Sequence, residues 1–207
     1  YTHSEMLPAH GYPELRKYPH LKGNVGKAWF DQAKLMEKFP GTFVVNTNCI
    51  VPPKKNCGYL DRLFTYKIVG VEGSTPIVDD NFDALIKRTL ECEDANGIDF
   101  NETTTLTTGH HYKTVLTLAP QILKALEEGK IKQFFVVAGC DAPGKGGEYY
   151  RELTSSLPKD CVIITSSCGK FRFNDIDFGE IEGTGIPRYL DLGQCNDSNG
   201  AVEIAKA

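Results

Sequence analysis

The sequence predicts an α/β fold, with a mainly parallel, Rossmann-like sheet flanked by helices. Two observations lead to this prediction. From residue 79 onward, short apolar runs of strand length alternate with helical segments, as in three-layer α/β folds with right-handed crossovers. The apolar runs are nearly continuous rather than alternating, which is typical of strands that are buried on both faces of a parallel sheet.

We expect residues 1–78 to form the first part of the α/β region, built from short elements. The end of a strand and a loop are expected first, followed by a short helix. Helical spacing of apolar residues then predicts a longer helix, which Pro40 and Gly41 end. Strands follow on either side of Pro52-Pro53. The expected ranges are 1–9, 13–18, 28–39, 43–45 and 66–71.

Residues 79–207 predict the Rossmann-like region itself. Asp79 or Asp80 is expected to cap a helix that runs to residue 91. A second helical pattern covers residues 113–128, in which Pro120 either kinks the helix or marks its true start. Strands are expected from residues 134, 162 and 189, a flexible Gly-rich turn at 144–147, and helices from 149 and 198. The buried face of the first helix is predicted to hold Phe82, Leu85, Ile86, Thr89 and Leu90.

Bulk composition excludes several classes of protein. The 207 residues suffice for one large domain or two small ones, and the net charge of −4 leaves no footprint for nucleic acid or an anionic membrane surface. No apolar stretch approaches the roughly 20 residues of a membrane-spanning helix. Both ends look cut, so the chain is interpreted as a fragment of a longer protein.

Cysteine usage indicates the compartment. Seven cysteines cannot all pair with one another, and the sequence shows no signal peptide. A reducing compartment is therefore expected, and the localisation is predicted to be cytoplasmic. In such a compartment cysteines serve metals or redox chemistry rather than a disulfide framework.

Four of the cysteines stand just past short apolar runs, namely Cys49, Cys140, Cys168 and Cys195. In open α/β sheets, ligands bind beyond the carboxyl ends of the strands. Soft thiolates delivered to that edge favour a metal or iron–sulfur site. Glycines beside Cys140, Cys168 and Cys195 let the backbone turn sharply and approach an anionic cluster closely.

Other interpretations of the cysteines stay open at this point. Free cysteine is a good small core residue, which fits Cys161 inside an apolar run. A structural zinc site usually needs closely spaced pairs, and the chain has none. Cys57 and Cys92 are interpreted as surface or packing thiols. A Cys-His hydrolase is disfavoured, because the spacing pairs no histidine with a cysteine.

Charged residues at the predicted edge have two interpretations each. Glu5 follows another expected strand end and could add an oxygen ligand, although a loop glutamate is more often solvated. Basic side chains near the cysteines either offset the charge of a cluster or attract small anions, or they are simply solvated. These basic residues are Lys170, Arg172 and Arg188.

Taken together, these segments resemble the hybrid cluster protein family, also known as prismane proteins or hydroxylamine reductases. The resemblance runs through the whole chain in the right order. It is carried by His3-Ser4-Glu5-Met6-Leu7-Pro8-Ala9, Tyr18-Pro19-His20-Leu21, Asn48-Cys49-Ile50-Val51-Pro52-Pro53, Gly139-Cys140-Asp141, Cys168-Gly169-Lys170-Phe171-Arg172-Phe173-Asn174-Asp175 and Gly193-Gln194-Cys195-Asn196-Asp197.

The resemblance implies a hybrid iron–sulfur–oxygen cluster of four irons. Its implied ligands in this chain are Glu5, Cys49, Cys140, Cys168 and Cys195. Glu5 and Cys140 are also the implied catalytic residues, and the cysteine at the Cys140 position carries an extra sulfur as a persulfide in the family. The family's ligand histidine and second ligand glutamate lie outside this chain, as does the domain that holds a conventional iron–sulfur cluster. Ser4 replaces the glycine of the family's usual H-G-E triplet.

The implied function is reduction of a small nitrogen compound, hydroxylamine to ammonia or nitric oxide to nitrous oxide, with electrons from a donor protein. The isolated fragment is expected to be inactive and to hold no metal. Two alternatives are kept. One is a carbon monoxide dehydrogenase-like metal-cluster enzyme, which the stretch from Cys168 to Arg172 disfavours. The other is a non-enzymatic thiol or nitric-oxide redox protein.

Overall fold

The computed structural model describes residues 1–47, 49–93 and 103–207 of the chain. The chain forms two compact units, and each is described here by itself. The first unit consists of residues 1–28 and 105–207, and the second of residues 29–104. The boundary predicted after residue 78 falls inside the second unit.

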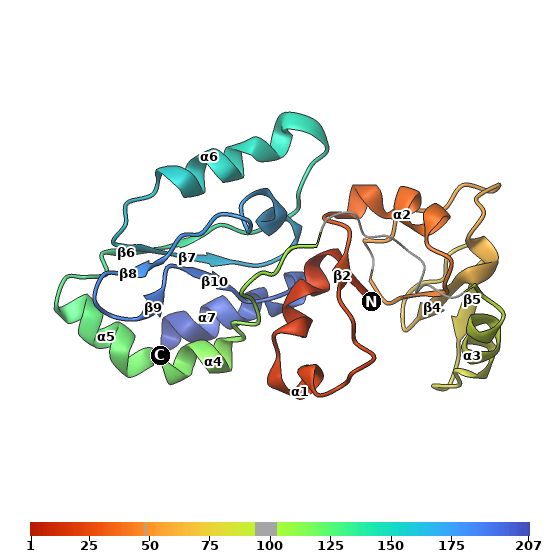
Figure 1. Cartoon of the computed structure of the whole chain (residues 1–207), viewed down its shortest axis with the longest axis horizontal. Coiled ribbons are helices and arrows are strands. Elements are labelled where there is room, and N and C mark those ends of the chain that lie inside the picture. Colours follow the sequence, from red (N-terminus) through yellow and green to blue (C-terminus); the bar gives the residue numbers. More distant parts are fainter. Residues whose placement is uncertain (48, 94–102) are drawn as a thin grey trace. The chain divides into compact units, whose positions relative to one another are not determined.

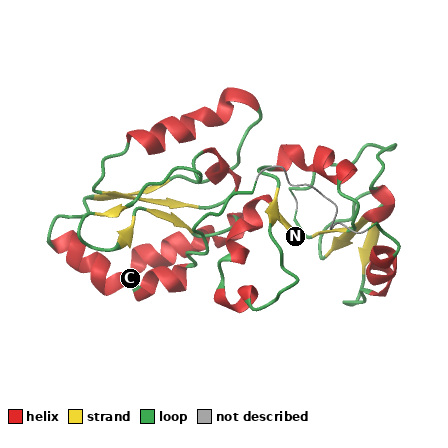
Figure 2. Cartoon of the chain, viewed as in Figure 1, coloured by secondary structure: helices red, strands yellow, loops and turns green. Residues whose placement is uncertain are grey.

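A three-stranded parallel sheet is the centre of the first unit (Figure 2). The strand order is β10-β7-β6, with Tyr189 opposite Ile163 and Phe135 opposite the same residue on the other side. All five residues of the middle strand are buried, as expected for a strand covered on both faces. The strands are β6 (Gln133–Val136), β7 (Cys161–Thr165) and β10 (Tyr189–Asp191).

Helices cover both faces of this sheet (Figure 1). Alternate residues of a strand point to opposite faces, so Val162 and Ile164 pack with Val115, whereas Ile163 packs with Leu153. The three-layer α/β prediction is confirmed for this unit. Helix α6 (Glu148–Ser156) lies on one face, and α4 (Tyr112–Thr117), α5 (Ala119–Glu127) and α7 (Asn199–Lys206) lie on the other.

Smaller elements complete the first unit. Pro120 stands in the first turn of α5, so it marks the start of a second helix rather than a kink in one long helix. The N-terminal segment forms the strand β1, then a 3₁₀ helix. The remaining elements are β1 (Thr2–His3), η1 (Ser4–His10), α1 (Pro13–Arg16), β2 (Asn24–Val25), β8 (Glu180–Ile181) and β9 (Ile186–Pro187).

The second unit has its own three-stranded parallel sheet, in the order β3-β4-β5. Its core is small and centres on Met36, Tyr59 and Leu63. The predicted strand at 43–45 and the helical pattern before it are confirmed, although the α-helix itself is shorter than expected. The elements are α2 (Gln32–Lys38), β3 (Phe43–Val45), β4 (Leu63–Tyr66), β5 (Thr75–Ile77) and α3 (Asp83–Leu90).

Two predictions for this unit are wrong. The strand expected at 66–71 ends at Tyr66, because Lys67 adopts a left-handed backbone with φ 53°. The helix expected from Asp79 or Asp80 begins only at Asp83, since both aspartates have positive φ and lie outside it. The side chain of Asn81 accepts a hydrogen bond from the Asp83 amide at 2.9 Å instead.

The predicted buried face of α3 is also wrong, because α3 has no buried residue. Its polar side makes the contacts with the rest of the unit. Thr89 bonds to Thr42 at 2.7 Å, and Arg88 pairs with Asp61 at 2.8 Å. Ile86 and Leu90 on the apolar side are therefore exposed. No helix in the described ranges 1–47, 49–93 and 103–207 is long and apolar enough to cross a membrane.

Candidate functional site

Three of the predicted ligand cysteines follow neighbouring strands of the first unit's sheet. Cys140 comes after β6, Cys168 after β7 and Cys195 after β10. Because the strands are parallel, their carboxyl ends meet at one edge of the sheet. Cys168 is buried there, whereas Cys140 and Cys195 are exposed. The fold thus brings three thiols to one edge, and their role as ligands stays a prediction.

Each strand end turns through a residue with a positive φ. These residues are Gly139 at 121°, Ser167 at 70° and Gly193 at 131°. Glycine reaches such angles without steric cost, which explains its position at two of the three turns. The serine at the third turn has ψ −167°, in a region that is essentially reserved for glycine. At each of these residues the chain turns sharply at the edge of the sheet, just before the segment that carries the cysteine.

Backbone hydrogen bonds join the three turns to one another. The amide of Gly169 donates to the carbonyl of Gly139 at 2.8 Å, and the amide of Ser167 donates to the carbonyl of Gly193 at 2.9 Å. A Cβ added to Gly169 would lie 3.1 Å from the Gly139 carbonyl oxygen, so the loops approach closely. The segments that carry Cys140, Cys168 and Cys195 are therefore held as one layer beyond the sheet.

A buried ion pair lies beneath this layer. Lys170 and Asp191 are 0% and 1% exposed, and the Lys170 Nζ donates to Asp191 Oδ1 at 2.7 Å and to the Gly193 carbonyl at 2.8 Å. Thr108 and the Gly193 amide also donate to the Asp191 carboxylate. Burial raises the pKa of Asp191, and the neighbouring Lys170 ammonium opposes that rise. The pair connects the Cys168 loop to the end of β10.

A second ion pair connects the Cys140 loop to the Cys168 loop. Arg172 Nε donates to both carboxylate oxygens of Asp141, at 2.7 and 2.9 Å, and a second nitrogen donates to Glu148 at 3.2 Å. A Cβ on Gly147 would collide with both Arg172 and Asp141. The Gly-rich segment expected to be a flexible turn is therefore a 3₁₀ turn whose last glycine makes room for an ion pair.

Glu5 lies at the same edge, on the 3₁₀ helix η1. Its Oε2 accepts a hydrogen bond from the Cys195 amide at 3.1 Å, although the two residues are far apart in sequence. Although Cys195 is exposed as a residue, partial burial of its thiol is the chief cause that raises its pKa to about 11, and the charges of Glu5 and Cys140 add to the rise. Glu5 and Cys140 therefore lie close enough to Cys195 to influence the ionisation of its thiol.

Two serines at this edge were missed by the sequence analysis as functional candidates. The Ser4 hydroxyl lies 3.2 Å from the Cys168 sulfur, and Ser167, whose hydroxyl is 3.3 Å from that of Ser166, directly precedes Cys168. The only signal in the sequence was the replacement of the family's usual glycine by Ser4. Both serines are buried.

Cys49 belongs to the second unit, after β3, and is exposed. Its strand β3 pairs with β4 in a separate sheet, so Cys49 does not follow a strand of the sheet that precedes the other three cysteines. Locally, the Cys49 amide donates to the Thr47 hydroxyl at 3.2 Å, and its carbonyl accepts from Gln32 at 3.0 Å. The spacing of the apolar run predicted a loop after a strand and gave no information on sheet membership.

The donor set at the edge of the first sheet fits an iron–sulfur group. Three thiols and one carboxylate gather on loops that are braced by buried ion pairs, and thiolates are the usual ligands of such clusters. In the described part of the chain, no group of three or more His, Cys, Asp or Glu side chains could hold a metal ion. The ligands of an iron–sulfur cluster bind different irons, so they need not converge on one point.

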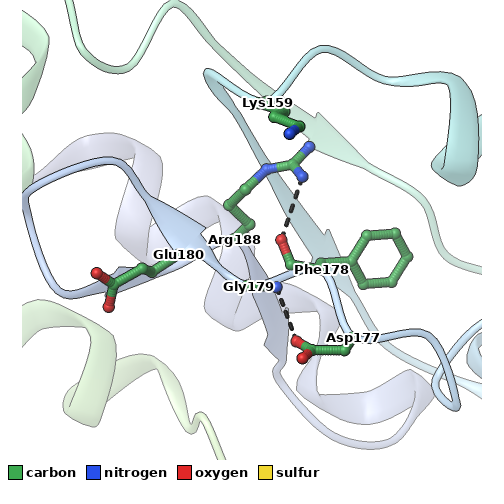
Figure 3. Close-up of a pocket in the computed structure, with 6 residues that line it drawn as sticks. All are labelled: Lys159, Asp177, Phe178, Gly179, Glu180 and Arg188. Carbon is green, nitrogen blue, oxygen red and sulfur yellow. Dashed lines mark hydrogen bonds between the residues drawn. The ribbon is translucent and has the colours of Figure 1, made fainter.

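A surface pocket lies near the start of β7 and β10, away from the cysteine edge (Figure 3). Arg188 lines it, and the guanidinium donates to the carbonyls of Cys161 at 3.1 Å, Phe178 at 3.2 Å and Pro158 at 2.7 Å. Because Cys161 begins β7, Arg188 lies at the amino ends of the strands. The interpretation of Arg188 as a cation beside the cysteines is therefore wrong, and its contacts indicate a structural role.

The sequence model of the Prismane/CO dehydrogenase family matches residues 1–207. The chain belongs to this family. The match covers both units and every segment on which the resemblance to hybrid cluster proteins rested.

Curated relatives in the family bear the name hydroxylamine reductase. The proteins from Moorella thermoacetica, Methanothermobacter thermautotrophicus and Geobacter sulfurreducens are 47%, 45% and 48% identical to this chain, which they match over its whole length. The chain covers 47% of the first two relatives and 36% of the third. It therefore spans about half or less of the length of the curated relatives it matches.

Solved structures of similar fold come from carbon monoxide dehydrogenases. Carbon monoxide dehydrogenase IV from Carboxydothermus hydrogenoformans matches 89% of this chain with a TM-score of 0.63 and 16% identity, over 37% of its own length. A chain in a structure of acetyl-CoA synthase/carbon monoxide dehydrogenase matches 87% of this chain, over 34% of its own length, with a TM-score of 0.56 and 12% identity. At these identities the likeness concerns the fold alone.

Proposed function

We propose that this chain is the part of a hydroxylamine reductase-type oxidoreductase that supplies five ligands to a hybrid iron–sulfur–oxygen cluster. The proposed ligands are Glu5, Cys49, Cys140, Cys168 and Cys195. One observation carries the proposal: three cysteines and Glu5 meet at the carboxyl edge of one parallel sheet. The names of the relatives and the family match support the choice of reaction class.

The chemistry that such a cluster supplies is electron transfer to a small nitrogen compound, either hydroxylamine or nitric oxide. Thiolates suit the sulfur-bridged irons, and the carboxylate of Glu5 suits an oxygen-bearing iron. The chain's other residues hold this donor set in place. Lys170 and Arg172 brace the loops from beneath, through carboxylates that are themselves buried. A reducing compartment, which we take to be the cytoplasm, keeps the thiols available.

The substrate side of the proposal involves the exposed members of the set. Cys140 and Cys195 are exposed, whereas Cys168 is buried, so a small molecule reaches the donor set from the side of Cys140 and Cys195. Glu5, bonded to the Cys195 amide, lies on that side. We therefore assign Glu5 and Cys140 to the reacting region and Cys168 to anchoring the cluster. An electron-donor protein completes the proposed reaction.

The test is metal analysis of the full-length protein purified without oxygen. We expect about four irons beyond those of a conventional cluster, with acid-labile sulfide and no nickel. Nickel in stoichiometric amount would favour the carbon monoxide dehydrogenase-like alternative. Absence of iron would contradict the proposal and favour a protein whose thiols are modified rather than bound to metal.

Cysteine variants assign the ligands within the same test. Cys168→Ala is expected to lose the additional iron, because the anchoring thiolate is removed. Cys92→Ala is the matched control, since Cys92 is half-buried in the second unit and its sulfur contacts Arg88 rather than the cysteine edge. Unchanged iron content in Cys168→Ala would contradict the ligand assignment even if the wild-type protein contains the cluster.

A further inference from the structure

Two serines at the cysteine edge adopt backbone conformations that favour glycine. Ser4 has φ 51°, and Ser167 has φ 70° with ψ −167°. Both are buried, at 4% and 3% exposure, so neither gains from solvation of its hydroxyl. Conformations of this kind cost free energy for any residue with a Cβ, and they cluster at functional sites. A serine in each position indicates that the hydroxyl group compensates for the cost.

The Ser4 hydroxyl lies beside the sulfur of a proposed ligand. Ser4 Oγ is 3.2 Å from Cys168 Sγ, a contact between residues of η1 and of the loop after β7. The Ser167 hydroxyl lies 3.3 Å from the Ser166 hydroxyl. Of the two strained serines, Ser4 therefore has the geometry to act on a proposed ligand.

The proton on Ser4 has two possible acceptors. In the structure the Ser4 hydroxyl donates to the Lys27 carbonyl at 2.7 Å, so its oxygen can only accept a hydrogen bond from the Cys168 thiol. A cysteine that ligates iron is a thiolate and has no proton to donate. The short O···S contact then stays favourable only when the serine proton turns from the carbonyl to the sulfur.

We propose that Ser4 is a positioning residue that donates a hydrogen bond to the sulfur atom of Cys168 in the cluster-bound protein and thereby raises the cluster's reduction potential. The inference rests on the proposed function. A hydrogen bond to a cluster thiolate stabilises the more negative, reduced state, and such bonds are among the factors that set the potentials of iron–sulfur proteins. The left-handed backbone is what brings the short Ser4 side chain to the sulfur.

Paired substitutions separate the hydroxyl from the backbone strain. Ser4→Gly removes the hydroxyl and relieves the positive φ, whereas Ser4→Ala removes the hydroxyl and keeps the strain. The measurements are the iron content and the midpoint potential of the full-length protein, from a redox titration followed by electron paramagnetic resonance. Thermal stability is recorded in parallel.

The expected result is a shift of the midpoint potential to more negative values, equal for the glycine and alanine variants of Ser4. Stability is expected to divide them, with the glycine variant more stable than the alanine variant. Ser198→Ala is the control, because the Ser198 hydroxyl bonds to Ser166 at 2.9 Å rather than to a sulfur. Its potential is expected to match that of the wild type.

Two results would overturn the inference. An unchanged potential in both variants, with full iron content, would show that Ser4 has no effect on the cluster. A shift in the glycine variant but not in the alanine variant would attribute the potential to backbone strain. A wild-type protein without iron is a separate outcome: it contradicts the proposed function and with it the basis of this inference.

Discussion

The two units each contain a three-stranded parallel sheet, yet only one of them gathers predicted ligands. In the first unit every residue of the central strand β7 is buried, and three cysteines follow its three strands. In the second unit one predicted ligand, Cys49, follows a strand, the partly exposed edge strand β3. The same sequence pattern, a short apolar run followed by a cysteine, thus occurs in two different sheets of the structure.

The two units also differ in the side-chain contacts that hold the ends of their strands. The strand ends of the first sheet are braced by the buried pair of Lys170 with Asp191. The comparable buried cation of the second unit is Arg62, which donates to backbone carbonyls instead, at 2.6 Å to Gly41 and 3.3 Å to Met36. We infer that the first unit presents a preformed ligand layer, whereas Cys49 stands on a loop with less support.

Replacing Lys170 is expected to have the largest effect on stability. Lys170→Met leaves the Asp191 carboxylate buried without its cation, and breaking a buried pair in this way costs about 3–5 kcal/mol. The free energy of unfolding of the 207-residue chain, from urea denaturation, measures the loss.

Two further variants define what that loss means. Lys206→Met is the control, because Lys206 pairs with Glu203 on the surface and is expected to contribute less than about 1 kcal/mol. Lys170→Met combined with Asp191→Leu removes both charges and is expected to recover part of the loss. A Lys170→Met chain as stable as the wild type would show that the pair does not brace the first sheet.

Arg62 gives the matching experiment in the second unit. Arg62→Met leaves the carbonyls of Met36 and Gly41 without their donor, at a cost of roughly 1–3 kcal/mol. Hydrogen exchange followed by residue is the measurement, because it reports local opening. Faster exchange is expected in β3 and β4 alone. Equal acceleration in β7 would mean that the two sheets unfold as one cooperative unit.

Sequence patterns predicted the strands of the first unit's sheet well because each is a continuous apolar run, and the middle strand β7 is fully buried. These runs identified β6, β7 and β10, and of the two alternatives for Pro120 the structure has the start of a helix. The second unit was predicted less well, since its short elements depend on backbone conformations with weak sequence signals. The positive φ of Lys67 ended β4 early, and the proline in β5 concealed that strand.

The residues of the candidate site were likewise predicted from the sequence only in part. The spacing after each strand predicted that Cys140, Cys168 and Cys195 would meet at one edge, and the sheet order bears this out. The spacing could not assign Cys49 to a different sheet, because sheet membership depends on long-range pairing. The contact of Ser4 with Cys168 depends on a backbone angle and on a neighbour distant in sequence, so no local pattern predicts it.

His110 makes the stability of the first unit depend on pH. Burial lowers the pKa of His110 below its ordinary value of 6.5, and its Nδ1 accepts a hydrogen bond from the Asp191 amide at 3.2 Å. As pH falls through about 6.5, the unfolded chain takes up a proton that the folded chain resists. Stability is therefore full above that pH and declines below it.

The test for His110 is the free energy of unfolding measured at a series of pH values between about 7.5 and 5, across the ordinary range of histidine titration. His110→Gln is expected to flatten the decline, since glutamine does not titrate. His20→Gln is the control, because His20 is exposed in the first unit and is expected to leave the slope unchanged. An unaltered slope in His110→Gln would assign the pH dependence to other groups.

The smallest effect is expected on the exposed face of α3, where the comparison of the two units is most direct. Ile86 on α3 is 55% exposed, whereas Ile122 on α5 is 8% exposed, although both follow the same helical apolar spacing. Ile122→Gln is expected to cost about 2–5 kcal/mol, and Ile86→Gln less than about 0.5 kcal/mol. Urea denaturation of both variants measures the difference. A large loss for Ile86→Gln would mean that another surface covers α3 in solution, because an isoleucine that stays in water has little burial energy to lose.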